Sequence, residues 1–150
     1  MILFEKVRWK NFLSTGNQFI EVNFQTDGES KFAKNSTTLI VGTNGAGKST
    51  ILDALTFSLF NKPFRKISKG QLVNTVNEKD CRVEVEFSIG PTSWKIVRGI
   101  KPNIFEIWRD GNLLDQSASA NDQQKWLELN VLKMNYKSFT QIVILGSSAF

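Results

Sequence analysis

Hydrophobic and polar residues alternate in two runs near the start of the chain, as they do in strands with one buried face. In residues 4–12, Val7 and Trp9 alternate with charged residues, which predicts a strand with one face toward solvent. The run 19–24 predicts a return strand that pairs with the first, after a turn at 14–16. We therefore expect an antiparallel pair of strands in this part of the chain.

A strand followed by a helix is predicted next. Residues 26–35 are polar and favour a surface loop, and residues 37–41 form a β-branched, apolar run typical of a buried parallel strand. Apolar residues then recur at helical spacing: Ile51, Leu52, Ala54, Leu55, Leu59 and Phe60. Their spacing predicts a helix from near Lys48 to near Asn61, since Pro63 opposes continuation.

A meander of antiparallel strands is predicted after this helix. Residues 81–89 alternate with period two, so their hydrophobic side chains should point inward and their charges outward. The runs 94–98 and 104–109 continue the meander, and a hairpin signal follows them. Glu84 and Glu86 are therefore expected on a solvated strand surface, rather than in a metal site or a catalytic pair.

Helical spacing returns in the last third of the chain. After a polar loop at 115–121, residues 122–132 predict a helix with one apolar face. Three residues on this face are expected in the core: Trp126, Leu129 and Leu132. Residues 136–141 suggest a short helical turn, and residues 142–145 a buried strand. The aromatic residues are scattered through strand positions, which favours core packing over a platform for stacking bases.

Composition narrows the possible chemistry. The chain has 150 residues, of which 41% are hydrophobic, enough for one globular core without disulfides. Its single cysteine, Cys81, suits a reducing cytosol, and the lack of histidine excludes zinc sites, histidine bases and Ser-His-Asp triads. The sequence has no run of about 18 apolar residues and no signal peptide, so we expect a cytoplasmic protein without a membrane partner. The net charge of +5 favours a nucleic-acid or phosphate partner.

One motif carries most of the functional information. Residues 42–50 match the phosphate-loop pattern G-x-x-x-x-G-K-[ST] at every fixed position. The residues are Gly42, Thr43, Asn44, Gly45, Ala46, Gly47, Lys48, Ser49 and Thr50. They stand between the predicted strand and helix, where backbone N–H groups and the helix dipole form an anion site. The sequence therefore predicts nucleotide binding rather than a glycine-rich turn that binds nothing.

Each polar side chain of this loop has an expected role. Lys48 should reach the β- and γ-phosphates, and it is the residue that we expect to act in catalysis. The hydroxyl of Ser49 should bind Mg²⁺, and Thr50 should contact the α-phosphate. The basic stretch at 61–70 is either a solvated loop or a contact for nucleotide or DNA phosphates.

Other parts of an ATP-hydrolysing site are missing from the sequence. Hydrolysis normally also needs an acidic residue at the end of an apolar strand to hold Mg²⁺, and a group that orients water. No apolar strand-like run here ends in a carboxylate, and there is no histidine. Either the sequence is part of a longer polypeptide, or the domain binds a nucleotide without turnover.

The motifs resemble those of the head domain of SMC-like ATPases. A strand ending in Lys-Asn-Phe at 10–12, the loop Gly-x-Asn-Gly-x-Gly-Lys-Ser-Thr and a Leu-Asp-Ala helix occur in that order. Within this group the chain most resembles ATPase subunits of DNA-repair nuclease complexes of the SbcC type, above all those of T-even-type phages. The stretches that carry the latter likeness are 60–65, 69–72, 101–106 and 141–146.

The resemblance implies an α/β fold, a phosphate-loop NTPase of the ABC-type ATPase head. Residues 1–150 would form its N-terminal lobe, with an antiparallel β-subdomain beside the phosphate-loop strand and helix. A coiled coil and a C-terminal lobe with the remaining catalytic residues would follow. Two such heads would enclose Mg-ATP as a homodimer and control a nuclease subunit on DNA. In this comparison Asn74, Thr75 and Val76 fall where the family's loop approaches the nucleotide.

Two positions depart from the family pattern. Many relatives carry an arginine that contacts ATP directly after Asn-Phe, where this chain has Leu13. Their Q-loop glutamine, which senses Mg²⁺ and the γ-phosphate, corresponds to Ser147 when counted from Phe139. The alternative is Gln141, which lies six residues earlier. A serine there would hold a water on the metal but reaches less far.

The residues and the resemblance together lead to one hypothesis and two rivals. We expect the Mg-ATP-binding lobe of an ATPase for DNA double-strand-break repair and recombination, and the chain alone should bind ATP without turnover. The first rival is a self-contained phosphate-loop NTPase or kinase, which would turn over nucleotide by itself. The second rival is a non-hydrolysing DNA-binding module whose DNA affinity is indifferent to ATP.

Overall fold

The computed structural model describes residues 2–24, 45–64, 67–114 and 119–139. The chain divides into two compact units, Met1–Leu114 and Asp115–Phe150. Three predicted elements lie outside the described residues: the loop at 26–35 and the strands at 37–41 and 142–145. No helix within the described ranges is long and apolar enough to cross a membrane.

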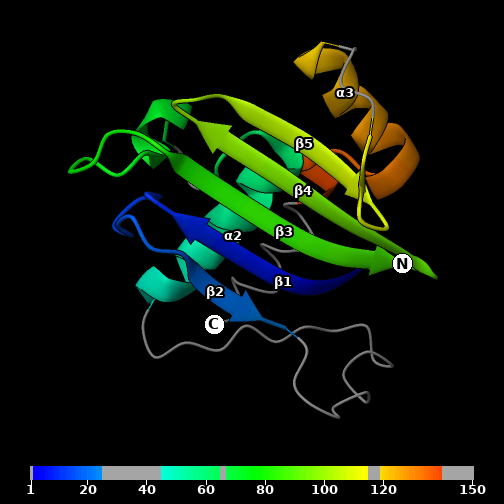
Figure 1. Cartoon of the computed structure of the whole chain (residues 1–150), viewed down its shortest axis with the longest axis horizontal. Coiled ribbons are helices and arrows are strands. Elements are labelled where there is room, and N and C mark those ends of the chain that lie inside the picture. The colour runs from blue at the N-terminus through cyan, green and yellow to red at the C-terminus, as the bar shows by residue number, and fades with distance from the viewer. Residues whose placement is uncertain (1, 25–44, 65–66, 115–118, 140–150) are drawn as a thin grey trace. The chain divides into compact units, whose positions relative to one another are not determined.

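The first unit is built on an antiparallel sheet of six strands in the order β2-β1-β3-β4-β5-β6 (Figure 1). The strands are β1 (Ile2–Lys10), β2 (Ile20–Asn23), β3 (Cys81–Ile89), β4 (Thr92–Ile100), β5 (Ile104–Arg109) and β6 (Asn112–Leu113). The predicted first pair is confirmed as β1 and β2, and the predicted meander as β3 to β6. Because β1 also pairs with β3, the pair and the meander form one sheet.

Alternating side chains of these strands form the hydrophobic face of the sheet. One row of paired residues crosses four strands and is buried throughout: Val7, Val85, Ile96 and Ile107. In the next row Trp9 pairs with Val83, and both are buried as predicted. A shift of one residue between two strands would turn such a row toward solvent, so this pattern specifies the register.

The helix α2 (Gly45–Phe60) packs on the hydrophobic face and contacts β1, β3 and β4 (Figure 1). It begins at Gly45, slightly before the predicted start, and ends next to the predicted end. Every residue from Leu52 to Phe60 is buried. Three of these residues are polar: Asp53, Thr56 and Ser58. The carboxylate of Asp53 accepts the N–H of Phe64 at 2.9 Å, and the two hydroxyls donate to backbone carbonyls of the preceding turn. The helix is therefore an internal element of this unit from Leu52 onward.

The carboxyl end of α2 is completed by a buried arginine from the sheet. Asn61 adopts a left-handed conformation with φ 63°, and its N–H donates to the carbonyl of Phe57 at 2.8 Å. The guanidinium of Arg98 donates to the carbonyl of Ser58 from Nε at 3.3 Å and from Nη2 at 3.1 Å. It also lies 3.6 Å from the centre of the Phe105 ring. A cation at the negative end of a helix is stabilising, so Arg98 caps α2 electrostatically.

The second unit contains a helix that changes type along its length. The α-helix α3 (Ala120–Trp126) is followed by η2 (Leu127–Leu132), which has the i→i+5 bonding of a π-helix. The hydroxyl of Ser119 caps α3 by accepting the N–H of Asp122 at 3.2 Å. Residues 136–139 form the described part of the predicted short helical turn.

The predicted core face of this helix is only partly correct. Leu132 is buried, but Trp126 and Leu129 are 41% and 75% exposed. The buried residues of η2 are Leu127, Val131 and Leu132. Val131 lies four positions after Leu127, and Leu132 lies five positions after it. The wider π-helical turn brings residues four and five apart onto one face, whereas the prediction assumed α-helical spacing.

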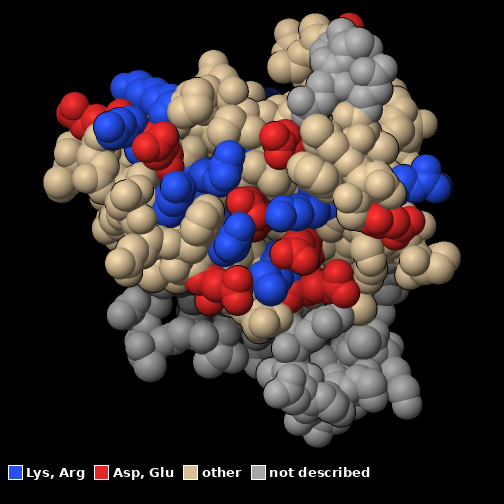
Figure 2. Space-filling model, viewed as in Figure 1, with Lys and Arg blue, Asp and Glu red and all other residues tan. Residues whose placement is uncertain are grey.

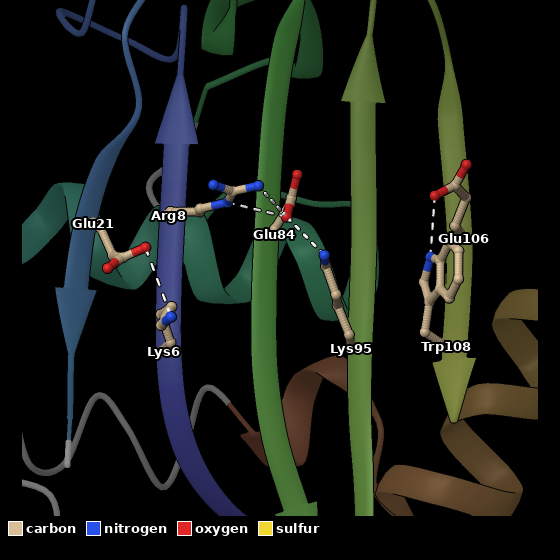
Figure 3. A network of polar contacts seen from close by, with 7 residues as sticks. All are labelled: Lys6, Arg8, Glu21, Glu84, Lys95, Glu106 and Trp108. Atoms are coloured by element: carbon tan, nitrogen blue, oxygen red, sulfur yellow. Dashed lines mark hydrogen bonds and ion pairs between the residues drawn. The ribbon is translucent and has the colours of Figure 1, made fainter. Parts of the chain in front are cut away.

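The face of the sheet that points away from α2 carries lysines, arginines and acidic residues interspersed with one another (Figure 2). Two contacts flank its centre. Lys6 Nζ lies 3.8 Å from Glu21 Oε1 across β1 and β2, and the indole Nε1 of Trp108 donates to Glu106 Oε1 at 3.1 Å (Figure 3). This side of the sheet therefore presents both signs of charge rather than one basic surface.

The prediction of a solvated surface is wrong for Glu84. This residue is only 4% exposed, because Arg8 and Lys95 reach over it from the neighbouring strands (Figure 3). Its Oε1 accepts from Arg8 Nε at 3.0 Å, and it lies 2.9 Å from Arg8 Nη2 and 3.2 Å from Lys95 Nζ. Glu86 is partly exposed, in agreement with the prediction. The carboxylate of Glu84 therefore ties β1, β3 and β4 together.

Candidate nucleotide site

The phosphate loop leads directly into the first turn of α2. Residues 42–44 and the side chains of 45–49 lie outside the described part of the structure, but the backbone of Gly45–Ser49 is helical. The first N–H groups of a helix have no partner within it, and its N-terminus carries a partial positive charge. The first turn of α2 contains no acidic residue that would neutralise this end. The backbone of the last residues of the motif therefore forms the first turn of α2, and Thr50 follows, partly buried.

The second predicted contact, at Asn74–Val76, forms a tight turn held by the side chain of Asn74. This side chain is buried, and its Oδ1 accepts the N–H groups of Val76 and Asn77 at 3.0 and 3.1 Å. Its Nδ2 donates to the carbonyl of Leu13 at 2.9 Å. Thr75 is exposed, and Val76 is 85% exposed. Asn74 thus shapes the turn, while Thr75 and Val76 form its accessible tip.

Asn11, at the end of β1, joins this turn to the loop that follows β1. Its side chain is 1% exposed, and its Oδ1 accepts from Asn77 Nδ2 at 2.7 Å. Its Nδ2 donates to Asn17 Oδ1 at 2.8 Å and to the carbonyl of Asp80 at 3.3 Å. The backbone carbonyl of Asn11 accepts the N–H of Asn74 at 2.9 Å. We call residues 11–17 and 72–80, joined in this way, the two-loop platform.

Leu13, the first of the two positions that we noted as departing from the family pattern, is held by the same platform. Its φ is 54°, a left-handed conformation that is unfavourable for a leucine. Its N–H donates to the carbonyl of Leu72 at 2.7 Å, and its own carbonyl accepts from Asn74. Bonds on both sides of the residue therefore hold its backbone against this cost.

The predicted metal ligands lie outside the described residues. This applies to the side chain of Ser49 and to both candidates for the Q-loop position, Ser147 and Gln141. In the described part of the chain, no three histidine, cysteine or acidic residues gather into a group that would hold a metal ion. The assignment of Mg²⁺ ligands thus remains a prediction from the sequence.

The basic stretch at 61–70 contains one lysine in an unusual environment. Lys69 begins the short 3-10 helix η1 (Lys69–Leu72) and is partly buried. Burial, together with the nearby Arg98 guanidinium, lowers the pKa of Lys69 from its usual 10.5. Lys62 is exposed, while residues 65–66 lie outside the described ranges. Both interpretations of this stretch, as a solvated loop or as a phosphate contact, stay predictions.

Two polar residues that organise this unit were not singled out by their sequence pattern. Asn11 appears only as part of the Lys-Asn-Phe motif, although an asparagine at the end of a strand is well suited to a left-handed residue such as this one, with φ 48°. Arg98 lies in β4, where the alternation of side chains shows only that Arg98 lies on the hydrophobic face of the sheet. Its contact with α2 joins residues 40 positions apart, so no local pattern reveals it.

Comparison with known proteins places this geometry in context. A family model described as an AAA domain matches residues 6–150. Exonuclease subunit 2 of Escherichia phage RB69 is 44% identical over 145 residues, which cover 97% of this chain and 24% of that protein. The DNA double-strand break repair Rad50 ATPase of Thermoplasma volcanium is 31% identical, with 92% of this chain and 14% of that protein covered. These similarities confirm the resemblance that the motifs predicted.

The chain also matches solved structures. The Smc head domain derived from Pyrococcus furiosus, with an extended coiled coil and bound to the C-terminal domain of ScpA, is 22% identical, with a TM-score of 0.49. That match covers 85% of this chain and 33% of the other. The chain spans about a quarter of the length of the phage relative that it matches.

Proposed function

This chain belongs to the AAA domain family, with SMC- and Rad50-like ATPases among its relatives, and we propose that it is the Mg-ATP-binding lobe of a DNA repair and recombination ATPase. The observation that carries the proposal is the complete phosphate-loop motif at the start of the sixteen-residue helix α2, which is buried from Leu52 onward. The positive end of a helix with no acidic residue in its first turn suits a triphosphate.

The residues of the loop would each contact a different part of the triphosphate. The backbone of residues 42–47 would surround the phosphates, since glycines at 42, 45 and 47 leave room for a close approach. Lys48 would bind the β- and γ-phosphates, and Thr50 the α-phosphate. Ser49 would hold Mg²⁺, together with Ser147 or, alternatively, Gln141. Bound Mg²⁺ supplies charge neutralisation to the phosphates.

The proposal extends to the assembly in which the lobe works. We propose that residues 1–150 join a coiled coil and a C-terminal lobe, and that two completed heads associate through ATP. The names of the relatives, an exonuclease subunit and double-strand break repair ATPases, support a nuclease partner and a DNA substrate. The net charge of +5 supports contact with the DNA backbone, which would be sequence-blind and sensitive to salt.

Isothermal titration calorimetry of the folded chain with Mg-ATP tests the central claim. The unmodified chain should bind, and Lys48→Ala should weaken binding by about 10- to 100-fold, because a charge-assisted contact to phosphate is lost. Lys125→Ala is the matched control, since it removes an exposed lysine outside the loop and should leave the affinity unchanged.

The same preparation separates the rival functions. Absence of heat with Mg-ATP in a sample shown to be folded would overturn the proposal. DNA affinity that ignores ATP and survives Lys48→Ala would instead favour the DNA-binding module. In a joined head, Lys48→Ala should also abolish nucleotide-dependent association, measured by analytical ultracentrifugation.

A further inference from the structure

The helical segment of the second unit exposes two large apolar side chains near its middle. Trp126, at the end of α3, is 41% exposed, and Leu129, in η2, is 75% exposed. The neighbouring Leu127 and Val131 are buried. Single exposed apolar residues are common, but a tryptophan and a leucine within one helical turn form a joint patch. Such patches are typical of surfaces that another protein covers, and tryptophan is enriched at the centres of those contacts.

The π-helical bonding of η2 accounts for the exposed leucine. A π-helical turn holds more residues than an α-helical turn, so Val131 and Leu132 face inward together with Leu127. Leu129, which lies between these positions, is left on the outside. π-Helices are rare and occur frequently at functional sites. The segment therefore keeps an apolar side chain in water through an uncommon helix type, which favours a role for that side chain.

Charged side chains of opposite sign lie at the two ends of the same segment. Asp122 lies in the first turn of α3, and Lys133 directly follows η2. Both are exposed, and among the described residues neither forms an ion pair. Asp122 precedes Trp126 by four positions, and Lys133 follows Leu129 by four. The order along the segment is acidic, aromatic, aliphatic and basic, with symmetric spacing, and we call the surface of these four residues the α3–η2 face.

We propose that the α3–η2 face docks on the same face of a second copy of this chain, with the two segments antiparallel. Because the spacing is symmetric, a two-fold axis at the middle of the segment places each group opposite a complementary one. Trp126 of each copy packs on Leu129 of the other copy. Asp122 of each copy lies opposite Lys133 of the other copy. Contacts that repeat in this way across a two-fold axis are the commonest kind in assemblies of identical chains.

The charges of the face favour this partner over the alternatives. Parallel docking of two copies would place Asp122 beside Asp122 and Lys133 beside Lys133, and like charges repel each other. A nucleic acid would meet a carboxylate at one end of the face and two apolar side chains at its centre, where its phosphates need cations. Antiparallel docking instead pairs both charges and removes both apolar side chains from water.

The proposed contact does not involve the phosphate loop, so it does not rest on the proposed function. Two short helical segments bury less surface than a standard interface, so the dimer of the isolated chain should be weak. In an assembly that already holds two heads together, the same contact is intramolecular and its effective concentration is higher. The α3–η2 face would then keep two lobes side by side in the absence of a nucleotide.

Sedimentation velocity of the chain without nucleotide tests the inference. Between about 1 and 500 μM, the weight-average sedimentation coefficient should rise from that of a monomer toward that of a dimer. Leu129→Glu should raise the dissociation constant of the dimer by about tenfold or more, because it places a carboxylate against the tryptophan ring of the other copy. Leu113→Glu is the matched control, since it makes the same change at an exposed leucine of the first unit and should leave the dissociation constant unchanged.

An exchange of charges tests the antiparallel register. Asp122→Lys would bring two lysines together at both ends of the dimer, and Lys133→Glu would bring two carboxylates together. Each variant alone should therefore dimerise about three- to tenfold more weakly. An equimolar mixture of the two variants should regain the affinity of the unmodified chain, because both ends of the mixed dimer again pair opposite charges. Circular dichroism checks that each variant keeps its helical content.

Three results would overturn the inference: a chain that stays monomeric at every concentration, self-association that Leu129→Glu leaves unchanged, and charge variants whose mixture associates no better than either alone. A dimer that requires Mg-ATP and is lost in Lys48→Ala would also overturn it, because the association would then belong to the phosphate loop. If the unmodified chain is monomeric and Leu129→Glu impairs its binding to a C-terminal lobe, that lobe is the partner instead. Failure to bind Mg-ATP would overturn the proposed function alone and leave this inference standing.

Discussion

Cys81 illustrates how a position in the sheet controls the chemistry of one side chain. It begins β3 on the hydrophobic face and is 1% exposed. Burial raises the pKa of its thiol from 9.0 to about 12, because the thiolate loses its hydration. Since only the thiolate is a good nucleophile, the free cysteine of this chain is a packing residue rather than a reactive one.

We predict that Cys81 reacts with a disulfide reagent about a thousandfold more slowly in the folded chain than in denaturant at the same pH. The rise of the pKa from 9.0 to about 12 lowers the thiolate fraction by that factor, and burial also blocks access. Stopped-flow measurement with a chromogenic disulfide gives both rates. A folded rate close to the denatured rate would contradict the assignment of Cys81 to the core.

The same pKa shift gives stability a pH dependence. The folded state holds the thiol proton more tightly than the unfolded state, so this contribution is fully present below pH 9.0 and is lost as the pH rises toward about 12. The variant Cys81→Ala should show a smaller loss of stability over that window, when the unfolding free energy is measured by denaturant titration.

Glu84 shows that the neighbours of a residue in sequence predict the face on which its side chain lies, but not its burial. Alternation places it on the face away from α2, which is correct. Its burial depends on Arg8, which is 76 positions earlier, and on Lys95 in the next strand. Strand pattern reports the face of a side chain, but the length and charge of its cross-strand neighbours decide whether water reaches it.

At the scale of elements, α2 depends on the sheet for its end as well as for its packing. The carbonyl of Ser58 near the carboxyl end of the helix accepts two bonds from the buried guanidinium of Arg98. The ring of Phe105 supports the other side of the guanidinium. This contact links the carboxyl end of α2 to β4 and β5.

We predict that Arg98→Met lowers the unfolding free energy by about 2–4 kcal/mol, because it leaves a buried carbonyl unsatisfied and removes a cation–ring contact. Arg98→Lys should lose less, since it keeps the charge but not the planar fork. Denaturant titration measures both. In Arg98→Met the pKa of Lys69 should rise toward 10.5, because one cause of its lowering is gone. Unchanged stability would contradict the capping role.

The helix of the second unit shows which element properties the sequence could not supply. Hydrophobic spacing located the segment, and the α-helical part begins at Ala120, close to the predicted start. The change to π-helical bonding at Leu127 moves the buried face to Val131 and Leu132 and leaves Leu129 exposed. A prediction from local periodicity assumes a single type of helix, and no local sequence pattern in this segment indicates the change from an α-helix to a π-helix.

At the scale of the whole molecule, the elements could be predicted but not their assembly. Alternation and helical spacing found β1 to β5, α2 and α3, because each depends on residues close in sequence. The pairing of β1 with β3 joins segments about seventy residues apart and has no local signature. The candidate site also has one part that depends on residues close in sequence and one part that depends on distant residues. The phosphate loop is a continuous motif, whereas the platform is made by bonds between separate loops.

The chain as a whole should bind Mg-ATP without turning it over. Hydrolysis requires a carboxylate at the end of an apolar strand and a group that orients water, in addition to the phosphate loop. The sequence has no such strand and no histidine. We therefore predict that phosphate release by this chain equals that of Lys48→Ala, measured with a phosphate-binding fluorescence assay under conditions where calorimetry shows saturation with Mg-ATP.

Addition of the missing groups should change this result. If the chain is one lobe of a head, then joining it to the remainder of a relative's head, such as that of the phage exonuclease subunit 2, should give turnover that depends on Lys48. Phosphate release by the chain alone, abolished by Lys48→Ala, would instead mean that these 150 residues hold a complete site and act as a self-contained NTPase. Turnover depends on Lys48 in both cases, so the phosphate loop is needed under either interpretation. The comparison instead decides whether the missing carboxylate lies within these 150 residues or in another part of the head.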